Sequence, residues 1–277
     1  GNSPDPLDLM EKYGVDALRV SLLMIAPQGL DILFSEERIE QGRNFMNKLW
    51  NSARFILMNI DSNIENFTSI PNPKDLDDTD LWILSRLNST IQSVNHSYES
   101  YKMNDAVKIV YDFVYSDFCD WYIELSKTRF YGKDEKDRKT ALNVSVYCMQ
   151  TILKLLHPYT PYITEELWAN FSDSKNSMLI TETWPKSEHK MINSNIESNL
   201  ELVKKTISAI RNIRAEMNIP MGKEIDIIVK SSKQDSEIFK SLKPYIVRLG
   251  KVEDITIDSN AVKPEQSASI VIDDNEI

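Results

Sequence analysis

The feature that most constrains this chain is the helical spacing of its apolar residues over long stretches with few breakers. Apolar side chains recur three or four positions apart, as at Leu84, Leu87 and Ile91, and the spacing returns in residues 106–121 and 142–156. Only 7 of the 277 residues are glycine and 11 are proline, too few for a large β sandwich. We therefore expect a mainly α fold built around a helical bundle.

The N-terminal residues predict a compact helix pair followed by one long helix. Pro6 can open a helix that ends near Gly14, and Asp16 can begin a second one. Apolar side chains occupy every second position in residues 29–34, which predicts a short strand. Ser35 can then cap a helix that runs to about residue 59. The polar residues 61–80 are expected to form a connecting loop.

Two later segments complete the predicted layout. The helix over 142–156 should stop at His157-Pro158, after which Thr160 can cap another helix. From residue 196 the pattern changes to a helix to about 217, a strand over 224–230, a helix over 235–249 and strand-like runs at 253–257 and 269–272. This alternation predicts a small C-terminal α/β domain.

A search for catalytic chemistry finds no phosphate-binding loop, no His-Glu-x-x-His and no Gly-x-Ser-x-Gly. The three histidines are far apart, and the two cysteines lack metal-site spacing, so reduced structural thiols are expected. We predict no catalytic residue and no metal site in this chain.

A formal net charge of −10 argues against general binding to nucleic-acid phosphates, which basic surfaces drive. Positive charge is nevertheless local. Residues 127–139 hold six basic and three acidic side chains, and further basic residues cluster at 204–214, whereas acidic residues gather separately at 75–80. Such runs are most often solvated faces, so they support nucleic-acid binding only modestly.

The helix over residues 41–55 is the most informative segment. Phe45, Leu49, Ala53 and Ile56 form an apolar stripe, and donor-rich side chains occupy the other faces. Amides and guanidiniums can read base edges, and an aromatic ring can stack an unpaired base. The alternative is an amphipathic helix whose polar residues only cap its neighbours. The candidate nucleic-acid contacts are Arg43, Asn44, Asn47, Lys48, Asn51, Arg54 and Phe55.

Several sequence blocks, in order along the chain, resemble valyl-tRNA synthetases, a family of class I aminoacyl-tRNA synthetases. They are Lys12-Tyr13-Gly14-Val15-Asp16-Ala17-Leu18-Arg19, Lys48-Leu49-Trp50-Asn51-Ser52-Ala53-Arg54-Phe55, Phe118-Cys119-Asp120-Trp121-Tyr122, His157-Pro158-Tyr159-Thr160-Pro161 and Ile210-Arg211-Asn212-Ile213-Arg214-Ala215-Glu216. The resemblance implies a stem-contact segment at 1–35, an anticodon-binding helical bundle at 36–171, a linker at 172–195 and a small α/β domain at 196–277.

The resemblance further implies that the chain recognises the anticodon of valine tRNA. Four basic residues are expected to contact the RNA backbone, namely Arg129, Lys133, Arg211 and Arg214. We expect a monomeric cytoplasmic protein with no DNA or membrane partner, cut from a longer ligase that continues into a coiled-coil arm.

The family's nucleotide-binding fold and Lys-Met-Ser-Lys-Ser loop are missing from these residues. The chain alone is therefore expected to be inactive and to need no cofactor, whereas the full ligase would charge tRNA with valine using ATP and magnesium. Two alternatives stay open: the same part of an isoleucyl- or leucyl-tRNA synthetase, or a non-catalytic helical scaffold for protein partners.

Overall fold

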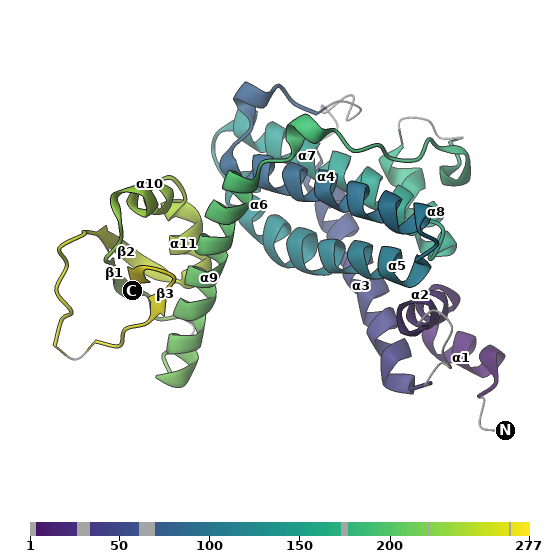
Figure 1. Cartoon of the computed structure of the whole chain (residues 1–277), viewed down its shortest axis with the longest axis horizontal. Helices are drawn as coiled ribbons and strands as arrows, with labels where there is room; N and C mark the ends of the chain where they lie inside the picture. The colour runs from purple at the N-terminus through teal and green to yellow at the C-terminus, as the bar shows by residue number, and fades with distance from the viewer. Residues whose placement is uncertain (1–3, 27–33, 61–69, 173–176, 221, 266) are drawn as a thin grey trace. The chain divides into compact units, whose positions relative to one another are not determined.

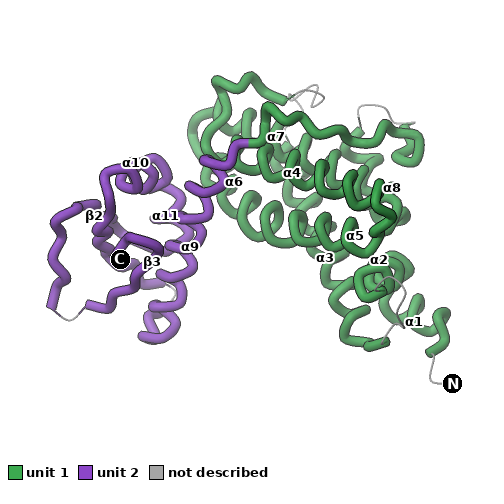
Figure 2. The backbone as a smooth tube through the Cα atoms, in the orientation of Figure 1, with its two compact units in different colours: residues 1–192 green, residues 193–277 purple. Residues whose placement is uncertain are grey.

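The computed structural model describes residues 4–26, 34–60, 70–172, 177–220, 222–265 and 267–277. The chain divides into two compact units, residues 1–192 and 193–277, coloured separately in Figure 2. Each is described by itself. Among the described residues, no helix combines the length and the apolar character that crossing a membrane requires.

Unit 1 begins with the predicted helix pair, α1 (Pro6–Tyr13) and α2 (Val15–Ile25) (Figure 1). The Asp5 carboxylate accepts a hydrogen bond from Leu7 N at 2.8 Å, which caps α1. Gly14 joins the two helices with a φ of 92°, a conformation that favours glycine. The strand expected over residues 29–34 falls mostly on residues 29–33, outside the described residues, and Phe34 itself lies in no strand.

The long helix α3 (Glu36–Asn59) follows as predicted, with Ser35 in the N-cap position. Its apolar stripe is confirmed, since Phe45, Leu49, Ala53 and Ile56 are fully buried. Their burial fixes the rotation of α3 in the bundle and leaves the donor-rich faces available.

The other helices of the bundle come from a contiguous stretch of the chain. They are α4 (Asp78–Glu99), α5 (Met103–Asp112), the π-helical η2 (Phe113–Tyr122), α6 (Ile123–Phe130), α7 (Glu135–Leu156) and α8 (Pro161–Phe171). The residues at the α5–η2 and η2–α6 junctions, Phe113 and Ile123, both keep right-handed helical backbone angles, so these three segments form one continuous helix.

The loop expected over residues 61–80 ends earlier than predicted, because α4 begins at Asp78. Residues 61–69 lie outside the described residues, and a short 3-10 helix, η1 (Pro73–Asp75), follows them. The Asp77 carboxylate accepts hydrogen bonds from the backbone N–H groups of Thr79 and Asp80, and the Asp80 carboxylate accepts one from Asp77 N. This reciprocal capping starts the helix inside the acidic run.

The acidic run and the basic segment, which are separate in the sequence, meet in the fold. Arg129 Nη1 lies 2.7 Å from Asp80 Oδ2 and 3.3 Å from Asp77 Oδ1, and Arg129 Nη2 lies 2.7 Å from Asp137 Oδ1. Lys136 pairs with Asp75 at the surface. Much of the local positive charge is therefore neutralised within the fold.

Residues 172–195, expected to be a linker, are largely part of unit 1. They include η3 (Leu179–Thr181) and η4 (His189–Met191). Glu188 N donates to Asn88 Oδ1 at 2.8 Å, and Trp184 Nε1 donates to Asn95 Oδ1 at 2.7 Å, so the segment is fastened to α4. The unit boundary lies instead between residues 192 and 193.

Unit 2 has the predicted α/β character. It comprises α9 (Ser194–Glu216), β1 (Ile225–Val229), α10 (Lys233–Ser241), α11 (Lys243–Gly250), β2 (Val252–Ile257), β3 (Val271–Ile272) and β4 (Asn275–Glu276). β1 and β2 pair in parallel, and β3 and β4 form an antiparallel pair. The single helix expected over 235–249 is two helices, because Pro244 lacks the N–H needed to continue the first one.

Candidate functional site

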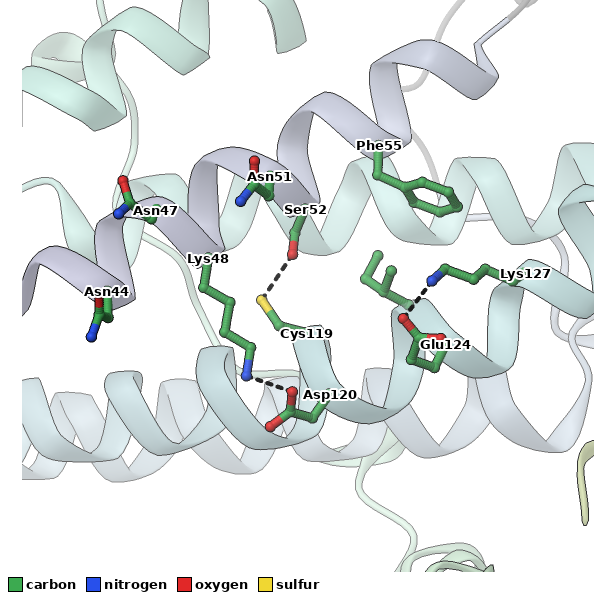
Figure 3. Close-up of a pocket in the computed structure, with 11 residues that line it drawn as sticks. Asn44, Asn47, Lys48, Asn51, Ser52, Phe55, Cys119, Asp120, Glu124 and Lys127 are labelled. Atoms are coloured by element: carbon green, nitrogen blue, oxygen red, sulfur yellow. Dashed lines mark hydrogen bonds and ion pairs between the residues drawn. The ribbon is translucent and has the colours of Figure 1, made fainter. Parts of the chain in front are cut away.

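A pocket of about 440 Å³ lies between α3 and the η2–α6 part of the neighbouring helix (Figure 3). Its lining residues are Asn44, Asn47, Lys48, Asn51, Ser52, Phe55, Cys119, Asp120, Ile123, Glu124 and Lys127. We call this pocket the α3 groove. Its α3 side carries side chains that the sequence singled out, and its other side carries residues from the Phe118–Glu124 region.

Three amides line the α3 side of the groove. Asn44, Asn47 and Asn51 are exposed, and their spacing of three and four residues places them on one face of the helix. Within the described part of the chain, none of the three side chains forms a hydrogen bond. Each therefore offers both a free donor and a free acceptor to a ligand.

Two lysines belong to the groove, and both are neutralised. Lys48 Nζ forms an ion pair with Asp120 and also lies 3.2 Å from the centre of the Tyr115 ring. Lys127 Nζ pairs with Glu124 and lies 5.4 Å from the centre of the Phe55 ring. Because each lysine faces a carboxylate, the groove has little excess positive charge and suits polar, uncharged groups better than anions.

Phe55 is half-buried at one end of the groove. Its ring stacks against Phe130 with centroids 5.7 Å apart, and it packs on the cluster formed by Phe130, Ala141 and Leu142. This support holds the ring in place without covering it completely. A supported, partly exposed aromatic ring is suited to stack a flat ligand.

The groove shows no sign of an activated nucleophile. Ser52 Oγ donates to Cys119 Sγ at 3.1 Å, and both side chains are buried. Burial raises the pKa of the Cys119 thiol to about 11, so it stays protonated near neutral pH. The arrangement can bind a ligand through amides and an aromatic ring, but it does not provide covalent chemistry.

Comparison with known proteins identifies a family that matches this chain. Residues 80–229 match the family described as the anticodon-binding domain of tRNA ligase. The chain belongs to this family. The match covers the η2–α6 side of the groove, whereas α3 precedes it.

Curated relatives of this anticodon-binding domain extend the likeness to the whole chain. A valine–tRNA ligase of Clostridium tetani is 39% identical over 100% of this chain and 31% of its own length. One from Fusobacterium nucleatum is 38% identical over 97% of this chain and 30% of its own. The chain thus spans about a third of the length of these relatives.

Solved structures share the anticodon-binding fold. A Mycobacterium tuberculosis methionyl-tRNA synthetase bound by methionyl-adenylate matches with a TM-score of 0.51 and 25% identity, over 61% of this chain and 34% of that one. The Agrobacterium radiobacter K84 agnB2 LeuRS, in its complex with tRNA and LeuAMS, matches with a TM-score of 0.51 and 21% identity, over 70% of this chain and 22% of that one. The second likeness shows the fold alone.

The fold brings together five of the predicted site residues, since Asn44, Asn47, Lys48, Asn51 and Phe55 all line the α3 groove. Arg54 is exposed on α3 but is not among the lining residues. Arg43 faces α1 instead, where its guanidinium carbon lies 5.7 Å from the centre of the Tyr13 ring and Nη2 lies 3.3 Å from Glu40.

Two of the four basic residues expected to contact an RNA backbone are structural. Arg129 is 4% exposed and bound to three carboxylates, so it cannot reach a phosphate. Arg214 is buried in unit 2, where its guanidinium donates to the carbonyl oxygens of Pro220, Lys223 and Lys251. Both predictions are corrected, because these guanidiniums satisfy groups of their own fold.

The other two basic residues are exposed. Lys133 lies in the turn before α7, and Arg211 lies on α9 of unit 2, where its Nε donates to Leu249 O. Neither lines the α3 groove. Their contact with RNA stays a prediction.

The sequence did not single out the residues that close the other side of the groove, notably Asp120, Glu124 and Lys127. Their spacing of three and four positions marks one helix face. Nothing in that spacing says which helix the face meets, so they could be assigned to the site only once the packing of α3 was known.

Proposed function

We propose that this chain is part of a valine–tRNA ligase and that the α3 groove holds unpaired bases of the tRNA anticodon loop. The observation that carries the proposal is the row formed by Asn44, Asn47 and Asn51, whose unbonded amides line the same groove as the partly exposed Phe55. Membership of the anticodon-binding domain family and the similarity to valine–tRNA ligases support it.

The chemistry of the groove suits single-stranded RNA. Amide side chains can pair with the donors and acceptors along a base edge, which is how sequence is read in unstacked loops. Stacking of one base on an aromatic ring contributes about 1–3 kcal/mol. Lys48 is paired with Asp120 and Lys127 with Glu124. These ion pairs reduce the nonspecific attraction of the groove for RNA phosphates.

The activity of the longer ligase is likewise a proposal. We infer that this chain binds and positions tRNA, and that valine activation with ATP and magnesium takes place in residues other than these. The match to an anticodon-binding domain, within about a third of the length of the valine–tRNA ligase relatives, supports this division of labour. We further propose that the chain acts in the cytoplasm as a monomer.

A binding titration tests the proposal. The protein is titrated by gel shift or filter binding with an unmodified valine tRNA transcript and with the same transcript carrying an altered anticodon, at one fixed salt concentration. Loss of a good base contact costs about 1–3 kcal/mol, so we expect affinity for the altered transcript to fall about tenfold or more. Equal affinity for both would contradict anticodon recognition.

Two further transcripts define the specificity. Isoleucine and leucine tRNAs carry different anticodons on the same general scaffold, so both are expected to bind more weakly than valine tRNA. Tighter binding of either one would assign the chain to that ligase instead. No binding of any tRNA would contradict the RNA-binding proposal.

A further inference from the structure

The part of α3 that borders the groove is unusually basic for this chain. Residues 41–59 contain Arg43, Lys48 and Arg54 but no aspartate or glutamate, although the net charge of the chain is −10. Lys48 pairs with Asp120 and Arg43 with Glu40. In the described part of the chain, no carboxylate pairs with Arg54, which is exposed. Arg54 therefore keeps a free guanidinium beside the groove.

Trp50 adds an exposed aromatic surface to the same helix. Its side chain is 43% exposed, whereas Trp82 and Trp168 are buried. Within the described residues, its ring makes no contact with another aromatic ring and its indole N–H has no hydrogen-bond partner. Tryptophan is enriched at interfaces because it combines a large apolar ring with a hydrogen-bond donor.

Three exposed residues in the second half of α3 form a line. Trp50, Arg54 and Met58 are spaced four residues apart, and Met58 is 73% exposed. We call them the outer stripe of α3. Asn47 precedes Trp50 by three residues and Asn51 precedes Arg54 by three, so the stripe borders the amide row of the groove.

We propose that the outer stripe is a second contact surface for the RNA held in the α3 groove. Trp50 stacks an unpaired base next to the one in the groove, and Arg54 binds the phosphate group that joins the two nucleotides. Met58 extends the apolar surface beyond Arg54. The proposal rests on the proposed function, because the outer stripe takes its ligand from the same RNA strand.

The chemistry of the outer stripe favours RNA over another protein. A protein partner would need an acidic or polar group for Arg54 and an apolar group for Trp50, with no reason to involve the amide row. An RNA strand supplies a phosphate and a π face from each nucleotide, and it can continue from the groove onto the stripe. Arginine also recognises phosphate through several donors at once.

The test uses an RNA hairpin with the anticodon loop sequence of valine tRNA and 2-aminopurine, a fluorescent adenine analogue, at single loop positions. Stacking on an indole quenches this fluorophore. For the wild-type protein we expect quenching at one loop position. Trp50→Ala should abolish that quenching and weaken binding roughly fivefold to a hundredfold, which corresponds to the loss of one base stack. Trp50→Phe keeps a ring and should retain most of the affinity.

Tyr162→Ala is the matched control, because Tyr162 is an exposed aromatic residue that does not line the groove. It should bind the hairpin like the wild type. If Asn51→Ala weakens binding while Trp50→Ala and Trp50→Phe both bind and quench like the wild type, the outer stripe is not an RNA contact and the groove proposal stands. If neither Asn51→Ala nor Trp50→Ala changes the affinity, the proposed function of the groove is wrong as well.

Discussion

The guanidinium of Arg129 and the carboxylate of Asp80 form an ion pair inside unit 1, with Nη1 and Oδ2 2.7 Å apart. Asp80 is fully buried, and its other oxygen accepts a hydrogen bond from Tyr122 Oη at 2.8 Å. Arg129 also binds Asp77 and Asp137. Arg129 thus links the last turn of α6 to the first turns of α4 and α7.

Arg129→Leu should strongly destabilise the protein, because it leaves the Asp80 carboxylate buried without its cation. We expect the free energy of unfolding to fall by about 3–5 kcal/mol, measured by urea denaturation. The control is Lys136→Leu, which breaks the solvent-exposed pair with Asp75 and should change the free energy of unfolding far less. Similar losses for both variants would mean that the buried pair has no special role.

The same variant should show a characteristic pH dependence. Burial raises the pKa of Asp80 from 3.8 to about 6 despite the nearby arginine, so the native state binds this proton more tightly than the unfolded chain. The contribution of Asp80 to stability therefore increases as pH falls through about 6. Removing Arg129 raises the pKa of Asp80 further, so the cost of Arg129→Leu should be smaller at about pH 5 than at about pH 8. A cost independent of pH would contradict this explanation.

The helices could be predicted from sequence to a large extent, because the spacing of apolar residues within one segment indicates both the helix and its buried face. The stripe of Phe45, Leu49 and Ala53 is an example, since local spacing alone determines it. The pairing of Asp80 with Arg129 could not be predicted in this way. The two residues are far apart in the sequence, and each reads as part of a solvated charge run.

The candidate site was predicted in the same partial way. The amides of Asn44, Asn47 and Asn51 were identified from their position on one helix, whereas the opposing residues Asp120 and Glu124 depend on how two helices pack. Residues 172–195 were expected to be a linker, but the segment up to residue 192 belongs to unit 1. Their attachment to α4 uses specific hydrogen bonds, which composition does not reveal.

Asp16 supplies a helix cap from a distant part of the chain. Its Oδ2 accepts a hydrogen bond from Ile163 N at 2.7 Å, in the first turn of α8, where Thr160 occupies the N-cap position but forms no side-chain cap. Asp16→Ala should lower the free energy of unfolding by about 1–2 kcal/mol, as measured by denaturation. Asp8→Ala removes an exposed carboxylate from α1. It should lower the free energy of unfolding much less than Asp16→Ala does. Equal effects would rule out the cap.

Gly42 permits the close approach of α2 and α3. A Cβ atom added at this position would lie 2.2 Å from Ser21 Oγ and 2.6 Å from the backbone oxygen of Ala17. Gly42→Ala should therefore cost about 1–3 kcal/mol in thermal or urea unfolding. Gly222→Ala, which meets open space, should be nearly neutral. Adding Ser21→Ala to Gly42→Ala should recover only part of the loss, because the Ala17 oxygen remains.

Cys119 should react slowly with thiol reagents in the folded protein. It lines the groove but is buried, and burial raises the pKa of its thiol to about 11. The thiolate is the reactive form, so native protein at about pH 8 should be modified far more slowly than free cysteine. Reaction with a chromogenic disulfide, followed by absorbance, should reach two thiols per chain only after denaturation. Rapid reaction of one native thiol would contradict the buried position.

The measurement that tests the groove most directly compares three proteins for binding to valine tRNA at the same salt concentration: the wild type, Asn47→Ala with Asn51→Ala, and Asn195→Ala. Asn195 is an exposed amide on α9 and does not line the groove. We predict that the groove variant binds about tenfold more weakly or worse, while Asn195→Ala binds like the wild type. Equal affinity of all three proteins would contradict recognition of the anticodon by this groove.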